Sequence, residues 1–493
     1  MSLQRADAAV FLAALCLAAT VQWTAGAYTS DFDAQADEPA HVVSSLLVRD
    51  YLTDGIPRNP LAFARTYYDH FPKVAIGHWP PLFHLTEALW TLVFGRTKGA
   101  LIAWPAVLAA AVATLIFSWV RRDCGPVPAS CAAIVFVASP LVQMSISAVM
   151  LDILLALTAL AAACALGDYF ESGRKRDAVR FVLCGLAALS TNGRGIAVAL
   201  LFIPACAMRS RRWLWALIPM SILFFLPGLQ GGRASFTESL MNLWRFPLRM
   251  AIMMSWPVAA LALVGGGSVF RARDSRPRWA PMPALAISSL MLHSLGNWPL
   301  DDRYLLVAVP AVAALAGEGC RLCLVALDTR YRVVACALFV CAVVAFDVSR
   351  YSKKPDLGYH FFANQPWVQV HETSLIAGDP FHEGAFIAEM DLAEVHLRDL
   401  LRDRRRVHTV LRGSKKLAQS TWAGNSYRML FHTSREVDAW LDATGVTLVI
   451  AQTAGRPHVA QLLEAVTEDS VHWRELPAAH WPRDVRVFER VML

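Results

Sequence analysis

The chain has 493 residues, of which 56% are hydrophobic and only 17% are charged, and its mean hydropathy is +0.41. Soluble globular domains carry about 25% charged residues, so this composition excludes an ordinary water-soluble enzyme. The apolar runs lie in the first 350 residues or so, and each is close to the ~20 residues that a helix needs to cross a bilayer. The composition therefore predicts a polytopic membrane protein with a more polar C-terminal tail.

The apolar runs and the basic residues between them predict a membrane topology. Short loops rich in lysine and arginine stay on the cytoplasmic side of a membrane. With these loops as anchors, the sequence predicts eleven spans, at roughly 8–27, 99–120, 126–146, 148–167, 179–190, 196–208, 213–229, 250–266, 281–297, 304–322 and 332–348. The first is predicted to be a retained helix, because no clear signal-peptide cleavage site follows it. An odd number of spans places the C-terminal tail outside the cytoplasm.

The formal charge of +7 does not indicate a nucleic-acid partner, because the basic residues gather in loops between apolar runs. The ten cysteines also lie in or beside apolar runs, so the sequence predicts no disulfide framework. Cys320 and Cys323 are interpreted as two positions of an apolar helix rather than as a metal site.

Acidic residues open the predicted outer loop 28–98. The stretch DFDAQADEPAH contains Asp31, Asp33, Asp37, Glu38 and His41. A partly desolvated carboxylate near the membrane surface suits a general base, and it also suits a divalent metal ion. The alternative is an acidic loop in solvent.

The segment 82–95 is apolar but has only about 14 residues, which is too short to cross a bilayer unaided. Counting it as a span would place all the basic clusters outside the cytoplasm. It is therefore predicted to be a re-entrant or interfacial helix. Pro80 and Pro81 fix the backbone where it begins and leave N–H groups that suit a phosphate, to which His78 and His84 can add donors. The alternative is a proline-initiated interfacial helix with aromatic anchors.

Five arginines lie at the predicted outer side, against the positive-inside tendency, and they indicate an anionic ligand near the outer leaflet. They are Arg194, Arg233, Arg245, Arg249 and Arg303; Asp152 lies near the outer end of a predicted span. An ionisable residue in a span is costly and indicates function, so Asp152 is a candidate; the alternative is a structural pair with Arg194. Arg303, in DDRY, can hold a phosphate with two parallel hydrogen bonds or can extend to lipid headgroups.

Five motifs in chain order resemble the GT-C glycosyltransferases: DEP followed by His41, HWPPLF, VMLDILLAL, STNGRG and DDRYLLVAVPA. Over about residues 8–350, the likeness points to the bacterial branch of dolichyl-phosphate-mannose protein mannosyltransferases and lipid A aminoarabinose transferases. It implies a polyprenyl-phosphate-linked sugar donor, an active site on the outer face, and Asp37 or Glu38 as the base. Trp79 interrupts the usual proline motif, and Asn192 replaces the usual lysine, for which Arg194 can compensate.

The predicted fold class is a polytopic α-helical membrane protein, GT-C-like, with a small soluble domain. Residues 1–350 are the transmembrane catalytic module, and residues 365–493 alternate apolar β-branched runs with amphipathic helices, which predicts an extracytoplasmic α/β domain. The tail lacks a GxGxxG motif and a P-loop lysine, so the sequence does not predict nucleotide binding.

The predicted function is an inverting glycosyltransferase of the bacterial inner membrane. It moves a hexosyl or pentosyl group from a polyprenyl phosphate to a hydroxyl of a lipid, glycan or protein acceptor on the outer face. Asp37 and Glu38 are the catalytic candidates. The predicted substrate-binding residues are His41, His78, Asp152, Arg194, Arg245, Arg249 and Arg303. No cofactor is required by this scheme, and a divalent metal stays open. The alternative is a transporter or flippase of an anionic lipid-linked substrate, for which internal inverted repeats would be expected; the sequence shows none.

Overall fold

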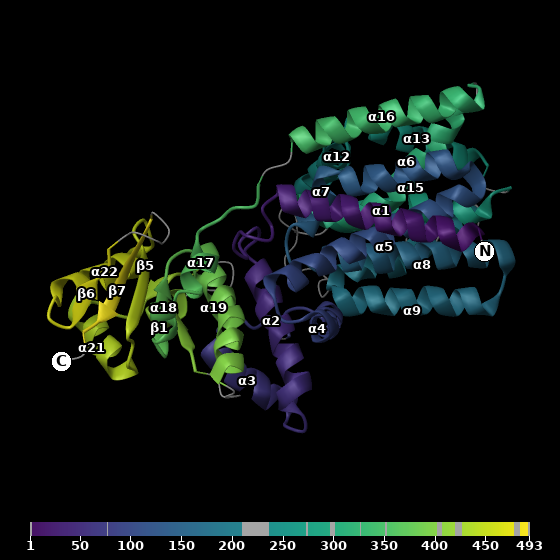
Figure 1. The fold of residues 1–493 in the computed structure, drawn as a ribbon. Helices are drawn as coiled ribbons and strands as arrows, with labels where there is room; N and C mark the ends of the chain where they lie inside the picture. Colours follow the sequence, from purple (N-terminus) through teal and green to yellow (C-terminus); the bar gives the residue numbers. More distant parts are fainter. Residues whose placement is uncertain are drawn as a thin grey trace. The chain divides into compact units, whose positions relative to one another are not determined.

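A computed structural model describes most of the chain, and its elements are labelled in Figure 1. The described residues are 2–75, 77–209, 236–272, 275–295, 301–325, 327–350, 353–401, 407–419, 426–477 and 484–491. The chain divides into two compact units. The helical unit is Met1–Ala25, Trp79–Phe83 and Ala103–Ser352; the mixed unit is Gly26–His78, His84–Ile102 and Lys353–Leu493.

The helical unit contains only helices among its described residues. They are α1 (Ser2–Thr24), most of α5 (Lys98–Cys124), α6 (Pro126–Ala138), α7 (Pro140–Ile146), α8 (Asp152–Ser172), α9 (Lys175–Thr191), η2 (Gly193–Gly195), α10 (Ile196–Arg209), α12 (Phe236–Met253), α13 (Trp256–Arg271), η4 (Pro277–Trp279), α14 (Pro281–Leu295), η5 (Asp302–Val307), α15 (Val309–Leu324) and α16 (Thr329–Ser349). The predicted span 213–229 lies outside the described residues.

Three of the described helices are long and apolar enough to cross a bilayer: Arg5–Thr24, Lys98–Cys124 and Asp152–Ser172. The number rises to five if each of two bent helix pairs is one span. The sequence predicts eleven spans, and this number stays a prediction. Several helices in the predicted spans, such as α10 and α14, are shorter than the ~20 residues that a straight crossing needs.

The prediction for 230–266 is wrong in its details. The described part of the predicted outer loop, 236–249, is helical and belongs to α12, which continues to Met253 in the predicted span 250–266. That predicted span contains a bend of 116° between Met241–Met253 and Trp256–Arg271. The many polar residues of this segment give it the composition of a loop. In the structure they form one face of the amphipathic helix α12. Ser255 in the break has a φ of 62°, which a continuous helix does not allow. The predicted span 126–146 is likewise bent by 58°, at Pro140.

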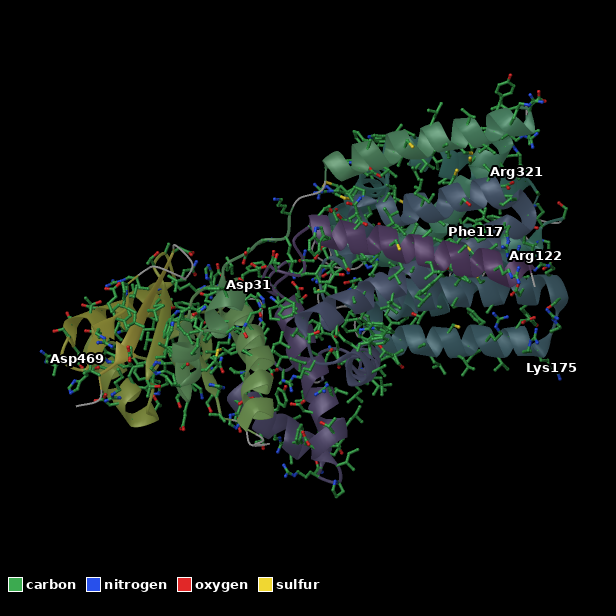
Figure 2. The ribbon with its side chains drawn as sticks, in the orientation of Figure 1. Asp31, Phe117, Arg122, Lys175, Arg321 and Asp469 are labelled. Atoms are coloured by element: carbon green, nitrogen blue, oxygen red, sulfur yellow. The ribbon has the colours of Figure 1, made fainter. Side chains whose placement is uncertain are left out.

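Basic residues gather at one end of the helices of the helical unit. Figure 2 shows Arg122, Lys175 and Arg321 at this end. Ion pairs join different elements at this end, such as Arg122 with Glu171 at 2.6 Å and Arg276 with Glu318 at 2.6 Å. A shared end is what the positive-inside rule requires of loops that face the same side of a membrane.

The mixed unit combines the first loop with the C-terminal segment. Its elements are α2 (Glu38–Asp50), η1 (Tyr51–Gly55), α3 (Pro60–His70), most of α4 (Leu82–Phe94), α17 (Tyr359–Ala363), α18 (Pro366–Gln369), β1 (Thr373–Ala377), α19 (Pro380–Leu401), β2 (Thr409–Arg412), α20 (Gly413–Lys416), β3 (Ala418–Gln419), β4 (Arg428–Met429), α21 (Ser434–Thr444), β5 (Leu448–Gln452), α22 (Pro457–Glu468), β6 (Trp473–Glu475) and β7 (Val485–Arg490).

A mixed sheet with the strand order β2-β1-β5-β7-β6 forms the centre of the C-terminal segment. Strand β1 runs parallel to β2 and β5, with Leu375 opposite both Leu411 and Val449, and β7 runs antiparallel to β5 and β6. Every residue of β5 is buried, as expected for a central strand whose two faces are covered. Helices α21 and α22 pack together and bury apolar residues with the sheet.

Buried ion pairs join the first loop to the C-terminal segment within the mixed unit. Arg96, just before α5, binds Asp50 of α2 at 2.7 Å and Asp391 of α19 at 3.0 Å. Lys98 binds Glu389 of α19 at 2.5 Å. Helix α19 also packs against α2. The position of α2, which carries the predicted catalytic carboxylates, is therefore fixed by a helix that lies far away in the sequence.

Candidate active site

The two candidate bases lie at the first turn of α2. Asp37 is the N-cap residue, its side chain makes no capping hydrogen bond, and it is half-buried. Pro39 stands in the first turn, where its fixed φ favours helix initiation.

Glu38 is in a different environment from its neighbour. It is fully buried, with Oε1 accepting a hydrogen bond from Lys354 Nζ at 2.7 Å and Oε2 accepting one from the Ala34 N–H at 2.9 Å. Both oxygens are therefore occupied by groups of the mixed unit. This arrangement favours a structural role for Glu38 and leaves Asp37 as the better candidate for a base.

Lys73 is a further candidate functional residue, and the motifs of the sequence do not single it out. It is 4% exposed, and burial lowers its pKa to about 7, assisted by Arg412 and opposed by Glu383 and Asp37. A Cβ on Gly384 would lie 3.3 Å from Lys73 Nζ, which is a tight contact. The absence of a side chain at this glycine therefore leaves room for the end of the lysine side chain. The signal in the sequence is that Lys73 is a basic residue of the predicted outer loop, against the positive-inside tendency, five residues before His78.

The structure brings His41 and His84 together, whereas His78 lies apart from this pair. His41 is buried in α2, and its Nδ1 lies 3.1 Å from Nε2 of the buried His84 in α4. One of the two nitrogens must donate the hydrogen, and the pair belongs to the packing of α2 against α4. His78 is exposed, four residues before α4 begins. The predicted start of this helix immediately after Pro81 is confirmed.

The other acidic residues of the first loop differ in how they are bound. Asp31 is buried and accepts hydrogen bonds from the N–H groups of Leu357, Tyr359 and His360, and burial, followed by the charge of Glu389, raises its pKa. Burial, together with the charge of Asp31, raises the pKa of Asp33 to about 8. Asp33 is therefore mostly protonated at neutral pH, and the carboxylate of Asp31 already accepts three backbone hydrogen bonds. The two side chains together make a poor site for a divalent metal ion.

In the helical unit, Asp152 and Arg194 form the ion pair that the sequence analysis considers as the structural alternative. Arg194 Nη2 lies 2.9 Å from Asp152 Oδ1, and both side chains are buried. Asn192 Oδ1 accepts hydrogen bonds from the Arg194 backbone N–H at 2.9 Å and from its Nε at 3.3 Å. The 3-10 turn η2 and the first residue of α8 thus hold one guanidinium in a fixed position.

The fixed guanidinium of Arg194 also keeps unused hydrogen-bonding capacity. Its carbon lies 4.3 Å from the centre of the Tyr304 ring, and Tyr304 stacks on His293 at 5.5 Å. Among the described residues, no group hydrogen-bonds to the buried Arg194 Nη1 or His293 Nε2. Buried polar atoms are nearly always paired, so these two atoms indicate a place for a polar ligand or water.

Arg303 and Arg249 lie on or near the same short segment, and the predicted Arg233 lies outside the described residues. Arg303 Nε pairs with Asp301 at 2.6 Å, and the guanidinium lies 5.4 Å from the Tyr304 ring that also contacts Arg194. Arg249 of α12 pairs with Asp302 at 3.2 Å. The structure thus gathers Asp152, Arg194, Arg249 and Arg303 around residues 301–304. Arg245, one turn earlier in α12, is exposed.

The buried pair gives a prediction about stability. Replacing Arg194 by alanine leaves Asp152 as an uncompensated buried charge, which is expected to lower the free energy of unfolding by about 3–5 kcal/mol. The double variant with Asp152→Asn should recover part of this loss, because no unpaired charge remains. Thermal unfolding of the purified proteins in detergent measures both effects. Equal losses from Arg194→Ala alone and in the double variant would contradict the pair.

Comparisons with known proteins give a likeness in structure only. No known family model matches the chain, and no curated protein sequence matches it. The structure of ArnT from Cupriavidus metallidurans bound to undecaprenyl phosphate is 14% identical, with 97% of this chain and 98% of that chain covered and a TM-score of 0.59. The apo state of the same protein gives a TM-score of 0.60 at 14% identity, with 97% of each chain covered.

A third solved structure shares the fold over a smaller part of its own length. It is an oligosaccharyltransferase from Archaeoglobus fulgidus in complex with Zn and sulfate, 12% identical, with 90% of this chain and 68% of that chain covered and a TM-score of 0.54. The similarity extends over almost the whole chain, including both units. This chain therefore shares its fold with ArnT and with the archaeal oligosaccharyltransferase, in keeping with the resemblance of its five sequence motifs.

Proposed function

We propose that the chain is a membrane glycosyltransferase that moves a sugar from a polyprenyl phosphate to an acceptor hydroxyl. The observation that carries this proposal is the likeness over 97% of the chain to ArnT, one of whose structures is bound to undecaprenyl phosphate. The fold alone permits many functions, so the assignment also depends on the residues of the two candidate groups.

The proposed reaction is a single displacement at the anomeric carbon. Asp37 accepts the proton of the acceptor hydroxyl, whose oxygen forms the new bond to the sugar while the bond between the sugar and the phosphate breaks. The polyprenyl phosphate leaves with the bonding electron pair, and the configuration of the sugar is inverted. Asp37 suits this role because its carboxylate is only half-buried, whereas Glu38 is fully buried and accepts hydrogen bonds from Lys354 and the Ala34 N–H.

The arginines of the helical unit are proposed to bind the donor phosphate. Negative charge grows on this phosphate as the sugar leaves, so fixed donors stabilise the transition state more than the ground state. Arg194 is fixed by Asp152 and Asn192 before any ligand binds, and its Nη1 keeps a hydrogen to donate. Arg303 is held by Asp301 in the same way. Fixed guanidinium groups need little rearrangement during the reaction.

The proposed location is the bacterial inner membrane, with the first loop and the C-terminal segment on the outer side. A labelling experiment tests this topology with Ser172→Cys and Ser470→Cys, both at exposed positions, in a background without the exposed cysteines Cys16, Cys323 and Cys341. An impermeant thiol reagent applied to spheroplasts should label position 470 and leave position 172 unmodified until the membrane is opened. The reverse pattern would overturn the proposed orientation.

Transfer is tested with the purified protein in detergent and a polyprenyl phosphate carrying a labelled sugar. Envelope lipids, glycans and proteins serve as separate acceptor pools, so the labelled pool identifies the acceptor class. The expected result is labelled acceptor together with an equal amount of free polyprenyl phosphate. Movement of the intact lipid-linked sugar across a vesicle membrane, without cleavage of the sugar–phosphate bond, would instead support a flippase.

A further inference from the structure

Three buried cysteines converge in the helical unit from helices that are distant in the sequence. Cys131 lies on α6, Cys320 on α15 and Cys336 on α16, three helices labelled in Figure 1. Their sulfur atoms all lie within 4.8 Å of one another, and those of Cys320 and Cys336 are 3.6 Å apart. The proposed sugar transfer uses none of them.

Small residues near the sulfur atoms allow α15 to approach its neighbouring helices closely. A Cβ on Gly317 of α15 would lie 3.1 Å from the Ala132 Cβ of α6, so these helices approach each other one turn from Cys320 and beside Cys131. Gly319 similarly allows the backbone of Leu261 in α13 to approach α15. Close backbone packing limits the movement of α6 and α15, and α16, which carries Cys336, packs against α6.

The spacing of the sulfur atoms matches the first shell of a metal ion. A metal–sulfur bond of about 2.3 Å places the sulfur atoms of a trigonal or tetrahedral site roughly 3.8–4.0 Å apart. The observed 3.6 Å for one pair, with all three atoms inside 4.8 Å, is near this distance before any ion is bound. Three thiols in an ordinary apolar core need not point at one another, because a thiol packs like any small hydrophobic group.

The chemistry of the surroundings selects the class of ion. Thiolate ligands bind soft ions such as Cu(I) in preference to hard oxygen-seeking ions. The shell around the three sulfur atoms is apolar and includes Leu324 and Leu261. Structural zinc sites almost always have four protein ligands, and the described residues supply three here. A three-coordinate soft monovalent ion fits this set better.

We propose that Cys131, Cys320 and Cys336 form a binding site for a soft thiophilic metal ion of the Cu(I) class. A thiol that ligates the ion as thiolate releases its proton to the solvent, and the positive ion offsets the cost of a thiolate in an apolar environment. An apolar cavity of about 430 Å³ adjoins the sulfur atoms and is lined in part by Cys320, Cys336 and the exposed Cys323. This cavity gives the ion a route to the three sulfur atoms, and Cys323 lies along that route.

The test uses Ag(I), a soft ion without redox chemistry under the assay conditions, and the full-length protein in detergent. Excess glutathione competes for single cysteines, so only sites with several sulfur ligands keep the ion. We expect the wild-type protein to retain one silver ion per chain by mass spectrometry of the metal. Cys131→Ala, Cys320→Ala and Cys336→Ala should each lose it. The matched control is Cys164→Ala, a buried cysteine of α8 outside the cluster, which should retain it.

A second measurement does not depend on the variants being folded. The X-ray absorption spectrum of the silver-loaded wild-type protein should show a first shell of sulfur atoms only. Oxygen or nitrogen ligands in that shell would overturn the proposal, and so would folded triad variants that all keep the bound silver. A disulfide between Cys320 and Cys336 in protein isolated without reductant would also overturn it, since the cluster would then be a redox pair. None of these outcomes affects the proposed sugar transfer.

Discussion

Replacing Asp37 by asparagine is expected to slow sugar transfer at least ~100-fold, while the protein stays folded and still binds the donor. Asparagine keeps the shape of the side chain but cannot accept a proton. Asparagine is about as favourable as aspartate at the N-cap of a helix, so the substitution should cost little stability. Turnover from a labelled polyprenyl-phosphate sugar and donor binding are measured on the same preparation.

Glu38→Gln is the matched control, because the two carboxylates are neighbours in different environments. Its substitution removes the negative partner of the buried Lys354, so the free energy of unfolding should fall by about 3–5 kcal/mol. The rate per folded molecule should change much less than in Asp37→Asn. Wild-type turnover by Asp37→Asn, or a larger rate loss in folded Glu38→Gln, would remove Asp37 from the proposed mechanism.

Arg303→Ala is expected to lower turnover by about 100-fold or more, with a smaller effect on donor binding. A charge-assisted contact that strengthens as the phosphate leaves contributes mainly to the transition state. Arg303→Lys should also be poor, because an ammonium cannot reproduce the two parallel hydrogen bonds of a guanidinium. Asp301→Asn should give an intermediate loss, since Asp301 positions the guanidinium through a contact of 2.6 Å.

Arg176→Ala controls for the simple loss of a positive charge. This arginine is exposed at the basic end of the helical unit, and its removal should leave turnover unchanged. Near-normal transfer by Arg303→Ala would show that Arg303 binds lipid headgroups instead of the donor. A higher KM with an unchanged kcat in Arg303→Ala would mean that the contact is equally strong in the ground state and in the transition state. That result would contradict the proposed role of Arg303 in the transition state.

Features that depend on neighbouring residues in the sequence were predictable from it. The start of α4 after Pro81 follows from the fixed φ of proline, and strands β1, β2, β5 and β7 lie in the predicted apolar β-branched runs. The order of the five motifs predicted the fold. Local periodicity and residue type carry this information because the interactions extend over only a few positions.

Contacts between distant segments were decided by the tertiary structure alone. The different environments of Asp37 and Glu38 depend on Lys354, which lies 316 residues after Glu38. Burial of Lys73 depends on a glycine of α19, and the cysteine cluster needs three helices to pack in one register. Burial and pairing set the charge state and availability of such groups. They arise only when the chain is folded, so neither spacing nor composition can reveal them.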